Sequence, residues 1–267
     1  MAVEVTCRAS SLAALEGLPG SATQASSWLL LEARVPWGRD VAETELPADL
    51  RAAAEGFSGR VQLIRRPDRR DGELAVFTAE SGEGSGTLWR HDAPGELGAG
   101  APVGGMLVLV CCHGRRDPCC ARLGTPVFDA LCSHMESDAL WQTTHVGGHR
   151  FAANLLVLPA GILLGRIEPA DAANVATELR AGRIPLDHYR GRTIHPPEAQ
   201  AADAAVRRAL GLHGFGDVDV AGSDDGRVAI ETPQGPLTAV VDVADGPPLV
   251  ESCGKEPVPS VRYSVRW

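Results

Sequence analysis

Two hydrophobic patterns alternate along this chain of 267 residues. In the first, consecutive apolar residues form a short run, as in WLLL at 28–31, which is typical of a buried strand. In the second, apolar residues recur every fourth position, as Leu123, Val127 and Leu131 do, which places them on one face of a helix. The alternation of strand and helix patterns predicts an α/β fold.

The N-terminal part of the chain carries strand patterns around one helix pattern. The strand patterns cover 27–35, 60–66 and 73–79. A helix is predicted over 45–57, between the first two of these strands. The stretch 93–105 is rich in Gly, Ala and Pro and is the best candidate for an internal linker. We therefore expect an N-terminal β-α-β-β half that ends near residue 100.

The middle of the chain follows the order β-α-β-β-β-α. Strands are predicted over 106–111, over 139–144 and in both halves of 151–167, and helices over 121–135 and 171–182. This order is that of a thioredoxin-like layer. A similar β-α-β-β-β order can be read across 27–90, which raises the hypothesis of an internal duplication.

From residue 183 onward the patterns become weaker. An irregular stretch leads into an Ala-rich helix over 201–214, and a Pro-Gln-Gly turn joins the predicted strands 227–232 and 236–243. No chemistry is evident in this small α+β appendage. The predicted units are an N-terminal half (1–100), a thioredoxin-like domain (101–195) and the appendage (196–267).

Composition narrows the classes of protein and of partner. The formal charge of −9 argues against nucleic acid or an anionic membrane as partner. The N-terminal segment lacks the pattern of a secretory signal, and no apolar run reaches the roughly 18 residues of a membrane span. We therefore expect a cytoplasmic protein, in which structural disulfides are uncommon.

Four of the seven cysteines lie within VCCHGRRDPCC at 110–120, directly after a predicted strand. Because Gly114 and Pro118 interrupt helix formation, we expect a loop whose two ends can reach one point. A Cys-x8-Cys span can wrap a metal centre, whereas a redox dithiol usually has CxxC spacing, which is absent from the chain. The other cysteines, Cys7, Cys132 and Cys253, are interpreted as packing or incidental thiols.

A second candidate loop, HVGGH, holds His145 and His149. Gly147 and Gly148 disfavour a helix here, but a glycine-rich loop can also bring two imidazoles together. Two thiolates and two neutral imidazoles suit either tetrahedral zinc or an iron–sulfur centre with mixed ligation.

CCHGRRDPCC and HVGGHRFAANLLVLPAGILLGRI together resemble the sucrase/ferredoxin-like family, a branch of the thioredoxin-like [2Fe–2S] ferredoxins. That family shows a C-x-H-G-x-R-D-x-x-C loop followed by H-x-G-G-H-[RK]-[FY]-A-[AG]. The resemblance extends to WLLLEARVPWG and to YRGR at 189–192, and it covers roughly residues 1–195. It implies a thioredoxin-like ferredoxin core.

The resemblance also implies a set of cluster ligands. These are Cys111, Cys120, His145 and His149, with Cys112 and Cys119 as alternative thiolates. Arg115, Arg116 and Asp117 would support the ligands or dock a partner protein. The implied cofactor is a [2Fe–2S] cluster, with zinc as the alternative.

The function implied is that of a one-electron carrier that meets redox partner proteins. Two alternatives are open: a structural Cys2His2 zinc protein, and a thiol oxidoreductase of thioredoxin-like fold that uses adjacent cysteines, which pair poorly in disulfides. We expect a carrier rather than an enzyme. Sucrase activity has no support, because the sequence shows no convincing pair of glycosidase carboxylates.

Overall fold

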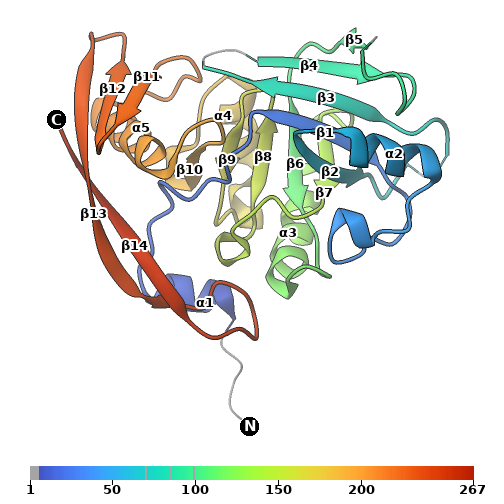
Figure 1. The fold of residues 1–267 in the computed structure, drawn as a ribbon, viewed down its shortest axis with the longest axis horizontal. Helices are drawn as coiled ribbons and strands as arrows, with labels where there is room; N and C mark the ends of the chain where they lie inside the picture. Colours follow the sequence, from blue (N-terminus) through green and yellow to red (C-terminus); the bar gives the residue numbers. More distant parts are fainter. Residues whose placement is uncertain (1–5, 70, 84–85, 99) are drawn as a thin grey trace.

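The computed structural model describes residues 6–69, 71–83, 86–98 and 100–267, and it contains a large sheet and a small one (Figure 1). The large sheet has the order β10-β9-β8-β6-β7-β2-β1-β3-β4-β5 within the described residues. Its strands are β1 (Ser27–Glu32), β2 (Arg60–Arg65), β3 (Val76–Ser81), β4 (Gly86–His91), β5 (Ala101–Pro102), β6 (Leu107–Cys111), β7 (Leu140–Thr143), β8 (Leu155–Leu158), β9 (Ile162–Leu164) and β10 (Tyr189–Arg192). The small sheet contains β11 (Asp219–Asp224), β12 (Arg227–Glu231), β13 (Leu237–Leu249) and β14 (Val258–Arg266).

Helices lie against these sheets. The α-helices are α1 (Cys7–Ala13), α2 (Ala48–Gly56), α3 (Pro118–Leu131), α4 (Ala172–Arg180) and α5 (Pro197–Leu210). The short 3-10 helices are η1 (Val41–Glu43), η2 (His149–Phe151), η3 (Pro169–Asp171) and η4 (Leu186–His188). None of the helices in the described ranges combines the length and apolar character needed to cross a membrane. The expected lack of a secretory signal rests on residues 1–11, of which 1–5 lie outside the described residues.

The two halves of the large sheet repeat one arrangement of strands. β6 pairs in parallel with β7 and antiparallel with β8, and β8 pairs antiparallel with β9. The N-terminal strands β1, β2, β3 and β4 pair in the same way, and β2 pairs antiparallel with β7 to join the two halves into one sheet. The α/β fold with a thioredoxin-like layer is confirmed, and the repeat agrees with the hypothesis of an internal duplication. The division into units at residues 100 and 195 stays a prediction.

The central strand β6 separates two apolar cores. Successive side chains of a strand point to opposite faces. Val108 and Val110 therefore enter the core under α3 and α4, whereas Leu107 and Leu109 enter the core on the other face. Because both faces are covered, β6 reads as an unbroken apolar run. The same alternation sends the two cysteines that follow to opposite faces.

α3 begins earlier than its apolar spacing predicts. The expected loop extended to Cys120, but the helix starts at Pro118, after Asp117. The Asp117 side chain accepts a hydrogen bond from the Cys119 backbone N–H, and a proline is well suited to the first helical position because it lacks a donor there. Cys119 and Cys120 therefore lie in the first turn of a helix.

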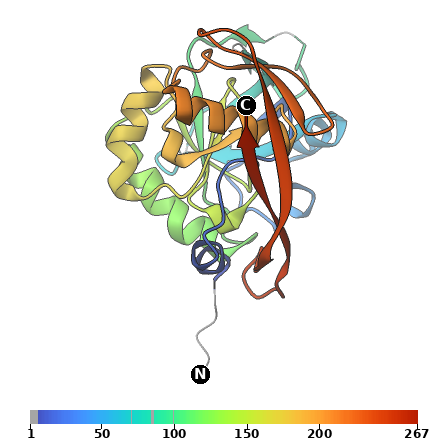
Figure 2. The ribbon, with the colours of Figure 1, turned by 90° about the vertical axis from the view of Figure 1, so that its left-hand side faces the viewer.

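The C-terminal region is more ordered than its sequence pattern suggests. α5 begins at Pro197 and packs Ala199, Ala202 and Val206 against the small sheet. β14, which was not predicted, pairs with β13 in a long antiparallel hairpin. Figure 2 shows this hairpin running along the molecule to the level of α1. The turn between β13 and β14 therefore lies in the same region of the fold as α1, whereas the C-terminus lies at the other end of the hairpin (Figure 1).

Candidate metal centre

The end of β6 and the start of α3 hold the first pair of predicted ligands, Cys111 and Cys120. Both cysteines are buried in the same core cluster. The helix packs closely on the strand at this point, because a Cβ added at Gly124 would lie 2.0 Å from the Cys111 carbonyl oxygen. This close approach places the first turn of α3, and with it Cys120, beside the end of β6.

The loop after β7 holds His145 and His149 on either side of two glycines. Gly147 has a φ of 97° and Gly148 a φ of 66°, which are left-handed conformations that favour glycine. A Cβ at Gly148 would also lie 2.3 Å from Nη2 of the buried Arg190. The HVGGH sequence therefore specifies a tight turn, as its glycines predict.

His113 positions this loop. Its Nδ1 accepts a hydrogen bond from the His145 backbone N–H at 3.2 Å, so its Nε2 donates to the Gly38 carbonyl oxygen at 2.7 Å. Burial lowers the pKa of His113, which favours the neutral ring that this pair of bonds requires. The ring therefore connects the cysteine loop to the histidine loop.

The structure brings three of the four predicted ligands into one group. Ligand atoms of Cys111, Cys120 and His145 all lie within 4.8 Å of one another, and Cys120 Sγ is 3.7 Å from His145 Nδ1. His149 lies beside this group, with its ring centroid 4.9 Å from that of His145. Its Nδ1 is buried and has no hydrogen-bond partner among the described residues.

The titration of these groups follows from their contacts. A hydrogen bond from the Cys120 thiol holds the pKa of Cys111 well below its usual range, and the same bond raises the pKa of Cys120. Burial, and then the neighbouring His145, lowers the pKa of His149. The group therefore offers a thiolate and a neutral imidazole, the protonation states in which these side chains ligate metals.

The structure places the two alternative thiolates elsewhere. Cys112 is buried in the core under α3, on the face of the sheet opposite Cys111. Cys119 turns away from Cys120 and packs against Cys7 and Cys253. Sequence reasoning missed these last two as members of a cluster, because no spacing motif links residues so far apart.

The three charged residues of the cysteine loop have different environments. Asp117 is buried, and its Oδ2 lies 3.7 Å from His149 Nε2. Arg116 pairs with Asp40 at 2.6 Å, and Arg115 is exposed. Among the three, Asp117 is therefore the one in contact with a predicted ligand.

Comparison with known proteins gives curated relatives and one solved structure. Altered inheritance of mitochondria protein 32 from Meyerozyma guilliermondii is 36% identical over 98 residues, which is 32% of this chain and 34% of that protein. The protein of the same name from Eremothecium gossypii is 27% identical over 137 residues, 44% of each chain. The chain thus spans well under two thirds of these relatives. A thioredoxin-like [2Fe–2S] ferredoxin from Aquifex aeolicus matches with a TM-score of 0.31 and 19% identity, over 36% of this chain and 97% of the ferredoxin.

These findings correct the expected function. The curated relatives are named for altered inheritance of mitochondria and not as electron carriers. The likeness to the solved ferredoxin is weak, at a TM-score of 0.31. The prediction of a one-electron carrier is therefore wrong.

The family itself is well supported. The sucrase/ferredoxin-like family model matches residues 18–191, a stretch that includes both the cysteine loop and the histidine loop. This match covers more than half of the sequence, so the chain belongs to the sucrase/ferredoxin-like family.

Proposed function

We propose that this protein binds a [2Fe–2S] cluster through Cys111, Cys120, His145 and His149. The observation that carries the proposal is the buried Nδ1 of His149, which lies beside the group formed by the other three residues and has no hydrogen-bond partner in the part of the chain that the structure describes. A buried polar atom without a partner costs about 1–3 kcal/mol. Ligation of iron would provide that partner.

The donor set fits this cofactor. Mixed ligation by two cysteines and two histidines is known for [2Fe–2S] clusters, in which imidazoles replace two thiolates. The lowered pKa of Cys111 favours a thiolate, and the lowered pKa of His149 favours a neutral imidazole. When bound, the cluster would supply visible absorption and, once reduced, a paramagnetic signal.

Two neighbouring residues would orient the ligands. His113 holds the backbone of His145 through its Nδ1. The Asp117 carboxylate faces Nε2 of His149 at 3.7 Å, so the other ring nitrogen, Nδ1, is the one free to ligate. Carboxylates commonly fix the ring orientation and basicity of metal-bound histidines in this way.

We also propose that the protein is located in a reducing compartment such as the cytoplasm. All seven cysteines are free in the structure, which supports a location where thiols stay reduced. Since the curated relatives are named for the inheritance of mitochondria, localisation of the tagged protein should be scored against both cytoplasmic and mitochondrial markers.

The test is anaerobic reconstitution of the full chain with iron and sulfide, followed by iron and sulfide analysis. We expect about two iron and two sulfide per chain, and visible absorption that bleaches on reduction. Cys111→Ala should abolish binding, whereas Cys112→Ala, the adjacent thiol on the opposite face, should retain it. A colourless chain that holds stoichiometric zinc at these four residues would overturn the proposal.

A further inference from the structure

Three thiols from distant parts of the chain meet beside α3. Cys7 begins α1, Cys119 lies in the first turn of α3, and Cys253 lies between β13 and β14. The Sγ–Sγ distances are 3.5 Å between Cys7 and Cys119, 3.4 Å between Cys119 and Cys253, and 3.6 Å between Cys253 and Cys7. The three sulfur atoms therefore form a nearly equilateral triangle.

A carboxylate lies against the triangle. Asp117 Oδ1 is 3.7 Å from Cys7 Sγ, and the ligand atoms of Asp117 and the three cysteines all lie within 4.8 Å of one another. Cys7, Cys119 and Asp117 are buried, and Cys253 is partly exposed. The cluster is thus shielded from solvent except at Cys253, where solvent can reach it.

We propose that Cys7, Cys119 and Cys253, with Asp117 as fourth ligand, form a zinc site separate from the centre at Cys111 and Cys120. Tetrahedral zinc has Zn–S bonds of about 2.3 Å, which sets neighbouring sulfur atoms about 3.8 Å apart. The observed Sγ–Sγ distances are within a few tenths of an ångström of that value. Thiolate ligands in a tetrahedral arrangement favour zinc over the harder divalent cations.

The nearly equal Sγ–Sγ distances argue against a disulfide bond in this cluster. A disulfide would join two sulfur atoms at about 2.05 Å and leave the third thiol without a role. All three cysteines are free in the structure. A single cation at the centre of the triangle would use all three sulfur atoms equally.

The backbone around the cluster is arranged to stabilise negative charge. The Cys7 N–H donates to Cys253 Sγ at 3.5 Å. The Cys253 N–H donates to Asp117 Oδ2 at 2.8 Å. Hydrogen bonds from such N–H donors are shorter and stronger when the acceptor is ionised than when it is neutral.

Repulsion between like charges opposes the ionisation of all three thiols at once. A hydrogen bond from Cys7 lowers the pKa of Cys119 to about 6, while burial raises the pKa of Cys253 to about 11. The hydrogen bond to Cys119 raises the pKa of Cys7. Like charges this close disfavour one another, and a divalent cation removes that repulsion.

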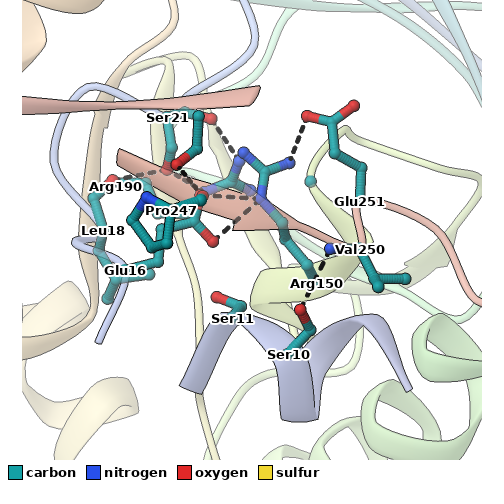
Figure 3. Close-up of polar contacts among 12 residues, drawn as sticks. Ser10, Ser11, Glu16, Leu18, Ser21, Arg150, Arg190, Pro247, Val250 and Glu251 are labelled. Carbon is teal, nitrogen blue, oxygen red and sulfur yellow. Dashed lines mark hydrogen bonds and ion pairs between the residues drawn. The ribbon is translucent and has the colours of Figure 1, made fainter. Parts of the chain in front are cut away.

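Other contacts join α1 and the residues after it to the segment between β13 and β14 (Figure 3). Ser10 Oγ accepts a hydrogen bond from the Val250 backbone N–H at 3.1 Å. Arg150 lies between these two segments and pairs with Glu16 at 2.9 Å and with Glu251 at 3.3 Å (Figure 3). Zinc at the cluster would fasten α1 and the β13–β14 hairpin to α3, and so stabilise the folded chain.

The test measures zinc in the full chain, purified under reducing conditions, together with zinc X-ray absorption of the unaltered protein. We expect one zinc per chain with three sulfur neighbours at about 2.3 Å and one oxygen at about 2.0 Å. Zinc held at Cys111, Cys120 and the histidines would instead show two sulfur and two nitrogen neighbours. That spectrum would overturn this inference and would also count against the proposed cluster.

Matched cysteine variants assign the site independently of the spectrum. Cys253→Ser should lower the zinc content at least tenfold. Cys120→Ser, which alters only the other centre, and Cys132→Ser, an exposed thiol away from both, should retain it. Retention of zinc by Cys253→Ser would overturn the proposal. So would a metal-free wild-type chain in which mass spectrometry finds Cys119 linked to Cys7 or Cys253.

Discussion

Two pairs of adjacent cysteines divide their thiols among three environments. Successive residues of a helix point about 100° apart, so Cys119 and Cys120 face different clusters from one turn of α3. Cys111 and Cys112 follow the alternation of β6 and enter opposite cores. The spare thiols of the CCHGRRDPCC motif therefore have separate positions, and Cys119 belongs with Cys7 and Cys253.

A single glycine should decide the position of His149. We expect Gly148→Ala to destabilise the fold by about 1–2 kcal/mol through its left-handed backbone, and by about 1–3 kcal/mol more through the clash with Arg190. The amount of [2Fe–2S] cluster bound per chain should fall in the same variant. Urea unfolding and iron analysis measure both effects.

Gly211→Ala is the matched control for this prediction. Gly211 has a φ of 67°, against 66° at Gly148, but a Cβ there would meet no atom of the described residues within 4 Å. It should show the backbone cost alone and keep its iron. Equal destabilisation of the two variants would show that the contact with Arg190 is unimportant.

At the scale of elements, the packing of α3 on β6 should control the separation of Cys111 and Cys120. In Gly124→Ala, the new Cβ would meet the Cys111 carbonyl oxygen at 2.0 Å, so the helix must move outward. We expect a loss of stability of about 1–3 kcal/mol and a loss of bound iron. Thermal unfolding and metal analysis of the reconstituted chain check this.

Gly56→Ala controls for the introduction of a methyl group into a helix. Gly56 ends α2, and within the described ranges a Cβ there would have no neighbouring atom closer than 4 Å. Its stability should change by less than about 1 kcal/mol, in the stabilising direction. If Gly124→Ala behaved like Gly56→Ala, the close approach of α3 to β6 would not govern the site.

The sequence predicts elements better than it predicts which side chains meet. The apolar run at Leu107 to Cys111 and the glycines of HVGGH predict a strand end and a turn, because these depend on local conformation. The start of α3 was missed since Pro118 was interpreted as a helix breaker rather than as its first residue. In the sequence, the internal repeat was visible only as a similar order of predicted elements. The parallel pairing of β1 with β2 and of β6 with β7 shows that the two halves share one strand arrangement.

At the scale of the whole molecule, α5 packs on the small sheet and contacts the large one beside a buried ion pair between two of its own residues. Arg207 Nε lies 2.7 Å from Asp203 Oδ1, and Tyr189 of β10 donates a hydrogen bond to the same carboxylate. Arg207→Met would leave Asp203 buried without its cation. We expect a loss of about 3–5 kcal/mol in the free energy of unfolding, measured by urea denaturation.

The adjacent Arg208 provides the comparison. It is exposed and donates to the Leu186 carbonyl oxygen at 2.7 Å. Arg208→Met should cost no more than about 1 kcal/mol, as for other exposed polar contacts. A similar loss in both variants would contradict a special role for the buried pair.

The cluster of Cys7, Cys119 and Cys253 also depends on how distant parts of the chain pack together. Cys7 and Cys119 are 112 positions apart, and Cys119 and Cys253 are 134 apart. No local pattern predicts such a contact, because it arises only when α1 and the segment between β13 and β14 pack beside α3. Cys7 and Cys253 were therefore interpreted as packing or incidental thiols, because the sequence alone does not show that they meet.

The central claim, a [2Fe–2S] cluster held by two cysteines and two histidines, is tested most directly by pulsed electron paramagnetic resonance. The sample is the reconstituted, dithionite-reduced full chain with 15N-labelled histidine. The account predicts strong coupling to two histidine nitrogens, reduced to one in His149→Ala and unchanged in His134→Ala, which alters an exposed ring. A reduced cluster without histidine coupling, or a chain that takes up no iron, would contradict it.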